Sequence, residues 1–163
     1  MLGADDPDFR EVIAPMEARR MGRLLKRAVW CSHKALQEAA VQMPDAIITA
    51  SDYGCMENSE AFLEGVLEVE GAAMRPTNFM QSTHNTIGSV IATRLRCHGY
   101  NATYSHTGRS LLSALEDAMM QIRLGDIHTA LVGWYDERTP RMDASRLPGA
   151  ERAVALVLSD KPC

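Results

Sequence analysis

The chain has 163 residues, of which 46% are hydrophobic and 23% are charged, and these values fit one globular domain rather than two. Its formal charge of -4 and its pI near 5.7 disfavour nucleic acids and anionic membranes as partners, because both attract a clustered positive field. No run reaches the roughly 20 apolar residues that span a bilayer, and the acidic start MLGADDPDF is unlike a secretory signal, so a cytoplasmic protein is expected.

The cysteine and glycine spacings give no sign of a cofactor. Cys31, Cys55, Cys97 and Cys163 show no close pair spacing, which favours free thiols in a reducing compartment over a disulfide framework. Neither a C-x-x-C nor an H-x-x-x-H spacing occurs, and no glycine-rich phosphate loop is found. We therefore expect no metal and no other cofactor.

The first third of the chain predicts an arm, a helix and a strand. Residues 1–17 are polar and proline-punctuated, and they are expected to form an extended N-terminal arm before a domain of residues 18–163. Residues 17–40 carry apolar side chains at helical spacing and predict an amphipathic helix. The string AIITA at residues 46–50 is typical of a buried parallel strand.

Three more helices and a strand are expected in the middle of the chain. A helix is predicted for residues 59–68, with Gly71 as its end. Its inward side chains are expected to be Phe62, Leu63, Val66 and Leu67. Apolar spacing predicts further helices over residues 86–95 and 110–124, and residues 102–105 between them predict a short strand.

The last elements complete a layered α/β fold. Residues 129–132 and 154–158 predict strands, and residues 136–149 predict a surface loop. Strands separated by helices imply a mainly parallel sheet with helices on both faces. Ligands in such sheets bind beyond the carboxyl ends of the strands. The segments on that rim are residues 51–55, 105–108 and 133–137.

A serine hydrolase is one chemistry that this rim suggests. It would use Ser105 or Ser110 as nucleophile, His106 or His84 as base and Asp136 to orient the base. The local string YSHTGRS lacks the G-x-S-x-G elbow, however. Ser110 is better explained as an N-terminal helix residue.

Methionines offer a second possibility, because their flexible side chains adapt to an acyl chain. The candidates for such a tunnel are Met56, Met74, Met80, Met119 and Met120. Filling of the core is the more common role of this residue type.

Several strings occur in an order that points to one family. They are AIITASDYG, the S-x-x-N pair Ser82 and Asn85, the pair Arg94-Leu95, the strand Gly99-Tyr100-Asn101-Ala102-Thr103, the run Ala130-Leu131-Val132-Gly133 with Asp136 and Glu137, and the closing strand 149–158. Together they resemble the N-terminal half of β-ketoacyl-(acyl carrier protein) synthases, which have a thiolase-like fold. They resemble more closely the divergent synthase-like N-terminal domains of aryl polyene and flexirubin type pigment clusters.

The resemblance implies where the catalytic cysteine of the family would lie. Counting without gaps from Gly99 puts that position at Gly108, which has no side chain to acylate. The backbone N–H of Gly108 matches part of the oxyanion hole of the family. Cys97 is expected to face away from the elbow. The substrate-binding positions that the resemblance implies are Ser82, His84, Asn85, His106 and Thr107.

The resemblance also implies partners. Dimers of the family join through the strand before the elbow, so the expected interface is Ala102, Thr103, Tyr104 and Ser105. We expect a homodimer, or a heterodimer with a full-length ketoacyl synthase, and acyl carrier protein as a further partner. The implied role is a non-condensing, chain-length-factor-like subunit of fatty acid or polyketide biosynthesis. The alternatives are an active acyltransferase with an unrecognised nucleophile and a degenerate structural fragment.

Two parts of the family pattern are missing. Family members begin with a hydrophobic strand inside the sheet, and residues 1–17 contain no comparable run. The chain is therefore expected to be a fragment of a longer product, or to have its sheet completed by another segment. The family's two catalytic histidines belong to a C-terminal half that would begin after Cys163, and none of the histidines here takes their place.

Overall fold

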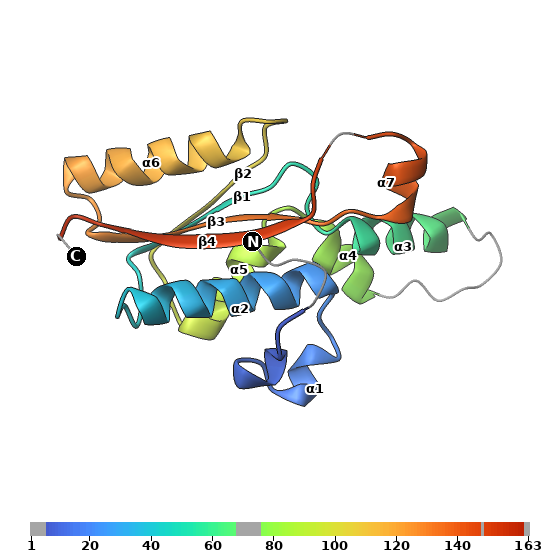
Figure 1. Ribbon diagram of the computed structural model, residues 1–163, viewed down its shortest axis with the longest axis horizontal. Helices are drawn as coiled ribbons and strands as arrows, with labels where there is room; N and C mark the ends of the chain where they lie inside the picture. The colour runs from blue at the N-terminus through green and yellow to red at the C-terminus, as the bar shows by residue number, and fades with distance from the viewer. Residues whose placement is uncertain (1–5, 68–75, 148, 162–163) are drawn as a thin grey trace.

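A four-stranded sheet forms the centre of the computed structural model, which describes residues 6–67, 76–147 and 149–161 (Figure 1). Its strands are β1 (Ala46–Ala50), β2 (Tyr100–Tyr104), β3 (Thr129–Asp136) and β4 (Arg152–Ser159). They lie in the order β2-β1-β3-β4. β1 is parallel to both of its neighbours, whereas β4 is antiparallel to β3. The mainly parallel sheet predicted from the sequence is confirmed.

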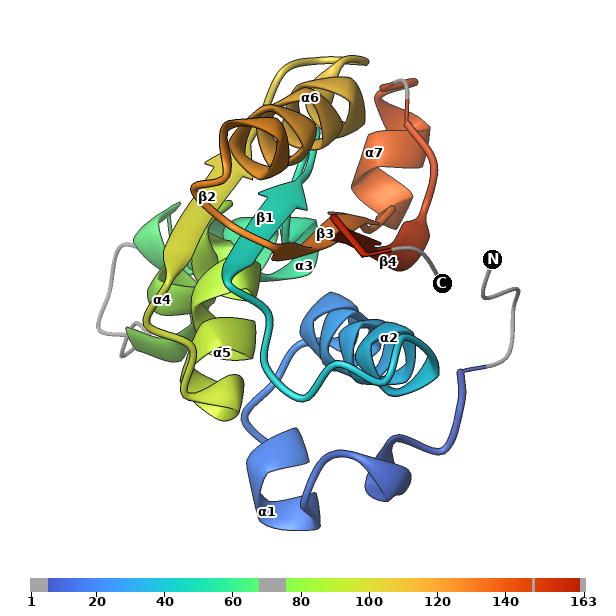
Figure 2. The same ribbon diagram turned by 90° about the vertical axis from the view of Figure 1, so that its left-hand side faces the viewer.

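Helices cover both faces of this sheet. α2 (Arg23–Glu38) and α5 (Thr86–Leu95) pack on one face, and α6 (Ser110–Leu124) packs on the other (Figure 2). Each face has its own apolar core. All five residues of β1 are buried because β1 lies inside the sheet and is covered from both sides. The remaining helical elements are η1 (Phe9–Glu11), α1 (Pro15–Ala18), α3 (Met56–Leu67), α4 (Pro76–Ser82) and α7 (Pro140–Ala144).

The predicted bounds of the regular elements hold best where the chain is buried. The predictions for β1, α5 and α6 agree with the structure at both ends. The helix expected over residues 17–40 is shorter, since α2 begins at Arg23 after an extended Gly22. The strand expected at residues 102–105 begins at Tyr100 instead. Gly71 lies outside the described residues.

The N-terminal segment is not an extended arm in its described part, residues 6–17. It forms η1 and the start of α1, and Ile13 between them is buried in the core under α2 and α5. The guanidinium of Arg94 on α5 donates to the carbonyl oxygen of Val12 at 2.8 Å. This side chain and this backbone acceptor help to hold the segment against the domain, together with ion pairs from Asp6 and Glu11 to α2 and from Glu17 to α5.

The predicted inward face of the helix at residues 59–68 is wrong. Leu63, Val66 and Leu67 of α3 are exposed. Figure 1 shows that α3 lies beyond the end of the sheet and does not cover a face of it. Its partner is α4, against which Phe62 packs on Phe79 with ring centroids 5.3 Å apart. A helix packed on one short helix buries only a narrow stripe.

The predicted surface loop at residues 136–149 is also wrong in part. Asp136 is the last residue of β3, and α7 follows with Thr139 as its N-cap. Asp136, Glu137, Thr139 and Met142 are all buried. The polar composition misleads here because one oxygen of Asp136 and one oxygen of Glu137 accept from backbone and hydroxyl donors inside the fold.

The sheet leaves no place for an additional inner strand. β1 pairs directly with β3 from Ala46 opposite Ala130 to Ala50 opposite Trp134. If another segment completes this sheet, it does so at an edge, because the described strands leave no inner position open. The hydrogen-bonded ladder is continuous from β2 to β4.

A buried hydroxyl pair connects β3 to α2. The hydroxyl groups of Ser32 and Tyr135 lie 2.7 Å apart, and both residues are buried. The ring of Tyr135 folds back over Gly133, where a Cβ atom would lie only 2.2 Å from it. Gly133 is therefore required to let Tyr135 reach Ser32.

We expect the two hydroxyls to stabilise the fold as a pair. Ser32→Ala or Tyr135→Phe alone leaves one buried hydroxyl without its partner, so each should lower the free energy of unfolding by about 1–3 kcal/mol. The double variant should lose clearly less unfolding free energy than the two single variants added together, because no buried hydroxyl is left without a partner. Urea unfolding of the four proteins measures this coupling, and strictly additive costs would contradict it.

Candidate functional site

The carboxylate of Asp136 organises the rim at the carboxyl ends of β1 and β3. Its Oδ1 atom accepts hydrogen bonds from the hydroxyl of Ser51 and from the backbone N–H groups of Asp52 and Tyr53, each at 2.9 Å. The side chain is buried at the end of β3. One carboxylate thus fixes the loop that follows β1.

Ser110, the first residue of α6, joins the elbow to the same loop. Its Oγ accepts from the backbone N–H of His106 at 2.9 Å and lies at hydrogen-bonding distance from Oδ1 of Asp52 and the carbonyl oxygen of Ser51. Ser110 is buried. The three rim segments that the sequence predicted are therefore brought together.

Gly108 lies at the outer side of this elbow. Its φ angle of 74° is in the left-handed region, which favours glycine. A Cβ atom placed on it meets no other described atom within 4 Å, and the residue is exposed. The position has room for a side chain and solvent access, but it offers no reactive group of its own.

The five predicted substrate-binding residues fall into two groups. His106 and Thr107 are exposed in the elbow beside Gly108. Ser82 ends α4 and donates to the carbonyl oxygen of Phe79 at 2.8 Å, while Asn85 precedes α5. His84 contacts the loop after β1, because a Cβ atom at Gly54 would lie 3.5 Å from its ring. That loop therefore lies between the two groups.

Asn85 belongs to an open groove between α4 and α5. The groove has a volume of about 530 Å³ and is lined in part by Phe79, Met80 and Val90. Its apolar lining fits a flexible hydrocarbon better than a polar metabolite. Asn85 supplies a polar side chain along this lining.

The serine hydrolase arrangement is not assembled. Among the described residues, the hydroxyl of Ser110 bonds to backbone atoms and Asp52, and no histidine ring nitrogen bonds to it or to Ser105. The Oδ1 atom of Asp136 is occupied by the loop after β1. The chemistry needs a serine, a base and an orienting acid in contact, and these three are separate.

The candidate methionines do not line a common tunnel. Met80 on α4 and Met119 and Met120 on α6 are exposed, and they lie on opposite sides of the sheet. Met74 lies outside the described residues. Core filling is wrong for the three exposed side chains as well. Within the described parts of the chain, no group of His, Cys, Asp and Glu is arranged to hold a metal ion.

The burial of Glu137 is a feature of the site that sequence reasoning missed, although the residue itself belongs to the predicted rim. Its carboxylate is buried and accepts from the backbone N–H of Glu57 at 2.8 Å, at the start of α3. Burial raises the pKa of Glu137 to about 7, and the nearby carboxylates of Glu57 and Glu60 add to the rise. The glutamate that follows the last β3 residue was the available signal, but its position in a polar segment suggested solvent.

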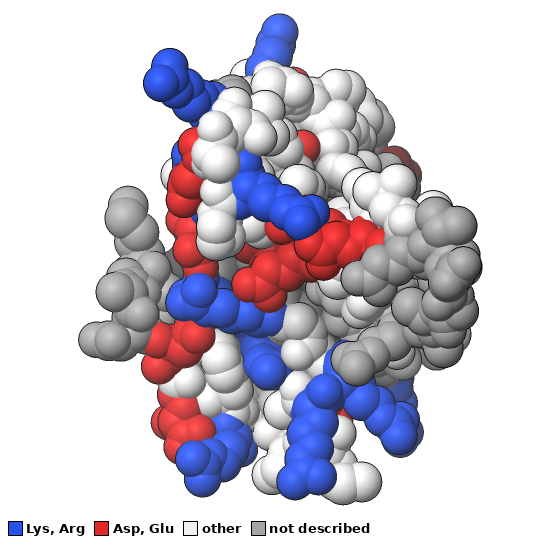
Figure 3. All heavy atoms as spheres, turned by 90° about the vertical axis from the view of Figure 1, so that its right-hand side faces the viewer, with Lys and Arg blue, Asp and Glu red and all other residues white. Residues whose placement is uncertain are grey.

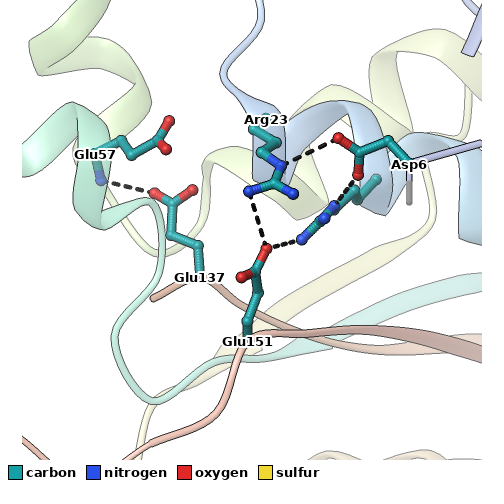
Figure 4. Close-up of polar contacts among 6 residues, drawn as sticks. Asp6, Arg23, Glu57, Glu137 and Glu151 are labelled. Carbon is teal, nitrogen blue, oxygen red and sulfur yellow. Dashed lines mark hydrogen bonds and ion pairs between the residues drawn. The ribbon is translucent and has the colours of Figure 1, made fainter. Parts of the chain in front are cut away.

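The same end of the molecule carries a gathering of charges. Figure 3 shows acidic side chains across the middle of this face with basic side chains around them. Figure 4 shows Arg23 between Asp6 and Glu151, to which its guanidinium lies 3.1 Å and 3.5 Å away. The buried Arg27 pairs with the same two carboxylates. These ion pairs connect the N-terminal segment, α2 and the start of β4.

The described thiols have few features of nucleophiles. Burial first, and then neighbouring carboxylates with Glu137 foremost among them, raise the pKa of Cys55 to about 12. Cys31 and Cys97 each donate to a backbone carbonyl oxygen at 3.3 Å, and burial raises the pKa of Cys31. A protonated thiol is a poor nucleophile. Cys97 lies before β2, away from the elbow as predicted.

Comparison with protein families gives one match that spans nearly the whole chain. Residues 3–162 match the model of the β-ketoacyl synthase N-terminal domain. The chain belongs to this family. The thiolase-like α/β fold inferred from the sequence motifs is thereby confirmed. A comparison with curated protein sequences finds no match.

Solved structures of ketosynthases share the fold of this β-ketoacyl synthase N-terminal domain. The ketosynthase ApeO in complex with its chain length factor ApeC, from Xenorhabdus doucetiae, matches with a TM-score of 0.76 at 24% identity, over 91% of this chain and 62% of the matched chain. The ishigamide ketosynthase/chain length factor matches with a TM-score of 0.79 at 19% identity, over 94% of this chain and 48% of the matched chain. The complex of a type II polyketide acyl carrier protein with its ketosynthase matches with a TM-score of 0.78 at 17% identity, over 95% of this chain and 52% of the matched chain.

The family domain described here spans less than two thirds of each of these matched chains. At these identities the likeness shows the fold. Across residues 6–67, 76–147 and 149–161, no helix combines the length and the apolar character that crossing a membrane would require.

We expect Glu137 to make stability fall as the pH rises. The pKa of this carboxyl rises from 4.5 to about 7 on folding, so the folded state holds its proton more tightly between these values. Raising the pH through that window should cost about 3 kcal/mol of unfolding free energy. Glu137→Gln keeps an acceptor for the Glu57 N–H, and it should be more stable than the parent at pH 8 and similar to it at pH 4.5.

Urea unfolding at half-unit steps from pH 4.5 to 8.5 checks this. Glu38→Gln removes the same charge from an exposed position at the end of α2 and should retain the parent's slope. Equal pH slopes for the parent and Glu137→Gln would contradict the assignment.

Proposed function

We propose that this chain is a non-condensing β-ketoacyl synthase-like subunit of fatty acid or polyketide biosynthesis, of the aryl polyene type. It pairs with a full-length β-ketoacyl synthase and helps to shape the acyl pocket, as a chain length factor does. Acyl carrier protein is the partner that delivers the acyl chain to the pair. Membership of the family and the likeness to ketosynthases with chain length factors support this proposal.

One observation carries the non-condensing part of the proposal. Gly108 occupies the elbow position at which the family motifs require a cysteine, and glycine has no group that accepts an acyl chain. A Cβ atom at this position meets no other described atom within 4 Å, although the φ angle of 74° strains any residue other than glycine. Its backbone N–H, at the start of α6, remains as a donor for a carbonyl oxygen.

The three thiols in the described part of the chain argue against an acyltransferase that uses one of them as nucleophile. A reactive cysteine needs a lowered pKa and solvent access. Cys55 has the opposite of both, because it is buried and its pKa is raised to about 12. Cys31 and Cys97 donate to backbone carbonyl oxygens.

The pairing part of the proposal is supported by the edge of the sheet. β2 ends the sheet and contacts β1 on one side. Its sequence, YNATY, contains no charge, proline or bulge that would discourage pairing with another strand. Ala102, Thr103 and Tyr104 on this strand, with Ser105 after it, are the proposed interface.

The empty nucleophile position can be tested by giving it a thiol. Gly108→Cys should take the acyl group from an acyl carrier protein thioester, forming a thioester on the new cysteine and releasing the thiol of the carrier. The new side chain meets no neighbouring side chain, and a helix N-terminus lowers the pKa of a thiol. The parent should form no adduct. Intact mass followed by peptide mapping measures this.

Thr107→Cys is the matched control, because it puts a thiol on the adjacent exposed residue one step further from α6. It should react more slowly by about tenfold or more, as expected for a thiol without the helix N-terminus. An acyl adduct on the parent chain would refute the non-condensing assignment and favour the acyltransferase alternative.

Pairing through β2 can be tested with an added charge. Tyr100→Lys puts an ammonium group at the start of the free edge, where an isolated chain can solvate it and an interface would bury it. The variant should fold normally and lose its complex with a full-length β-ketoacyl synthase that is produced together with it. Native mass spectrometry measures the complex, and circular dichroism the fold.

His98→Lys adds the same charge to an exposed residue before the strand and should keep the complex. A parent chain that stays separate from the synthase would reject the pairing proposal, and a complex that tolerates Tyr100→Lys would move the interface elsewhere.

A further inference from the structure

The outer side of β4 is the second open edge of the sheet. β4 is last in the strand order β2-β1-β3-β4, and no described strand lies beyond it (Figure 2). Its sequence, RAVALVLS, is apolar between the first and last residues and contains no proline. Val154 is 39% exposed, and Leu156 and Leu158 on the same face are only partly buried. Such an edge invites a further strand.

Backbone groups of alternate β4 residues point away from the sheet. The N–H of Asp160 donates to the carbonyl oxygen of His128 at 3.1 Å, one step beyond the last pair of the β3–β4 ladder. Directly opposed residues of an antiparallel pair alternate between those that exchange hydrogen bonds and those that do not. The even-numbered residues therefore bond to β3, and the odd-numbered residues from 153 to 159 direct their N–H and C=O groups outward.

Ala153 agrees with this assignment. Its carbonyl oxygen accepts from the thiol of Cys31 at 3.3 Å, so it is not directed at β3. A carbonyl oxygen has two lone pairs, and one remains for a further N–H donor. The outward row of β4 can therefore still form a ladder.

The sequence of this edge is complementary to itself. A new antiparallel partner must put outward-directed, odd-numbered residues opposite one another. If the partner is a second β4, the register centred on Leu156 puts Arg152 opposite Asp160. The same register puts Glu151 opposite Lys161 and aliphatic side chains opposite one another in between. Moving it by one allowed step puts Arg152 opposite a leucine or Asp160 opposite a valine.

Arg152 is ready to bind a carboxylate from across the edge. None of the ion pairs within the described ranges involves it. Its guanidinium carbon lies 3.7 Å from the centre of the Trp134 ring, and its Nε donates to the carbonyl oxygen of Ala150 at 3.1 Å. Stacking uses the face of the group, so the other N–H donors remain at its rim.

Asp160 of a second copy supplies this carboxylate. Its side chain is 36% exposed, and one of its oxygens lies 2.6 Å from Nδ1 of His128. Side chains alternate along a strand, so Arg152 and Asp160 share the α6 side of the sheet with Leu156 and Leu158. Directly opposed residues have Cβ atoms about 4.5–5.5 Å apart, which is within reach of these two side chains.

We propose that β4 is a self-association surface on which a second copy of this chain adds its own β4 antiparallel. Leu156 lies on the two-fold axis, and Arg152 pairs with Asp160 at both ends of the seam. This contact is additional to the proposed pairing with a synthase, because β2 and β4 are opposite edges of the sheet. Both edges can be occupied at once, which would join two of these subunits and two synthases.

Charge reversal tests the register. Arg152→Asp and Asp160→Arg each put like charges opposite one another at both ends of the seam. Each should therefore weaken self-association by about tenfold or more. Sedimentation velocity at low salt, where surface charges are least screened, measures the affinity. Circular dichroism checks the fold.

A mixture of the two variants separates a lost interface from a damaged fold. At these two positions the first variant carries only acids and the second only arginines, so a mixed pair regains both ion pairs. The mixture should associate about as tightly as the parent, while each variant alone does not. A mixture that associates no better than its components would overturn the proposal.

Two control variants locate the contact. Arg96→Asp makes the same charge change at an exposed residue after α5, and it should leave self-association unchanged. Tyr100→Lys alters the β2 edge and should also leave it unchanged. A parent that stays monomeric at its highest soluble concentration would refute self-association through β4. Single reversals that associate as tightly as the parent would refute it too, whatever the synthase binds.

Discussion

The buried carboxylate of Asp136 is the interaction on which the candidate site depends. It ends β3 and gathers the loop after β1 by accepting from two backbone N–H groups and a hydroxyl. That loop is in turn bonded to Ser110 at the start of α6. The positions of three segments that are far apart in sequence thus follow from one acceptor, and the elbow with Gly108 is held in place whether or not it carries a nucleophile.

The fold could be predicted from the sequence wherever periodicity and burial agree. AIITA is apolar throughout because β1 is buried on both faces, and α5 and α6 keep a regular inward stripe. The inward face predicted for α3 was wrong because an apolar stripe does not reveal how large the element is against which the helix packs. Leu63 and Leu67 look like core residues, yet α3 packs on a short helix beyond the sheet.

The site was predictable only in outline. The predicted strands, with the rule that ligands bind beyond the carboxyl ends of parallel strands, were enough to predict that residues 51–55, 105–108 and 133–137 lie on one rim. The burial of Glu137 could not be recognised, since acidic residues in a polar segment are usually solvated. Only the packing shows that its carboxylate is enclosed and bonded to the start of α3. Family membership accounts for the scaffold, while the chemistry of the elbow depends on the role proposed for Gly108.

The direct pairing of β1 with both β2 and β3 has a consequence for synthesis on the ribosome. Both partners follow β1 in the chain, and the first of them begins only at Tyr100. The most apolar strand therefore emerges long before any strand that can pair with it. Closing such long loops is slow, and an unpaired apolar strand is open to wrong contacts meanwhile. The amphipathic helix α2, which is complete before β1 emerges and packs on the same sheet, is the first surface that could shelter it.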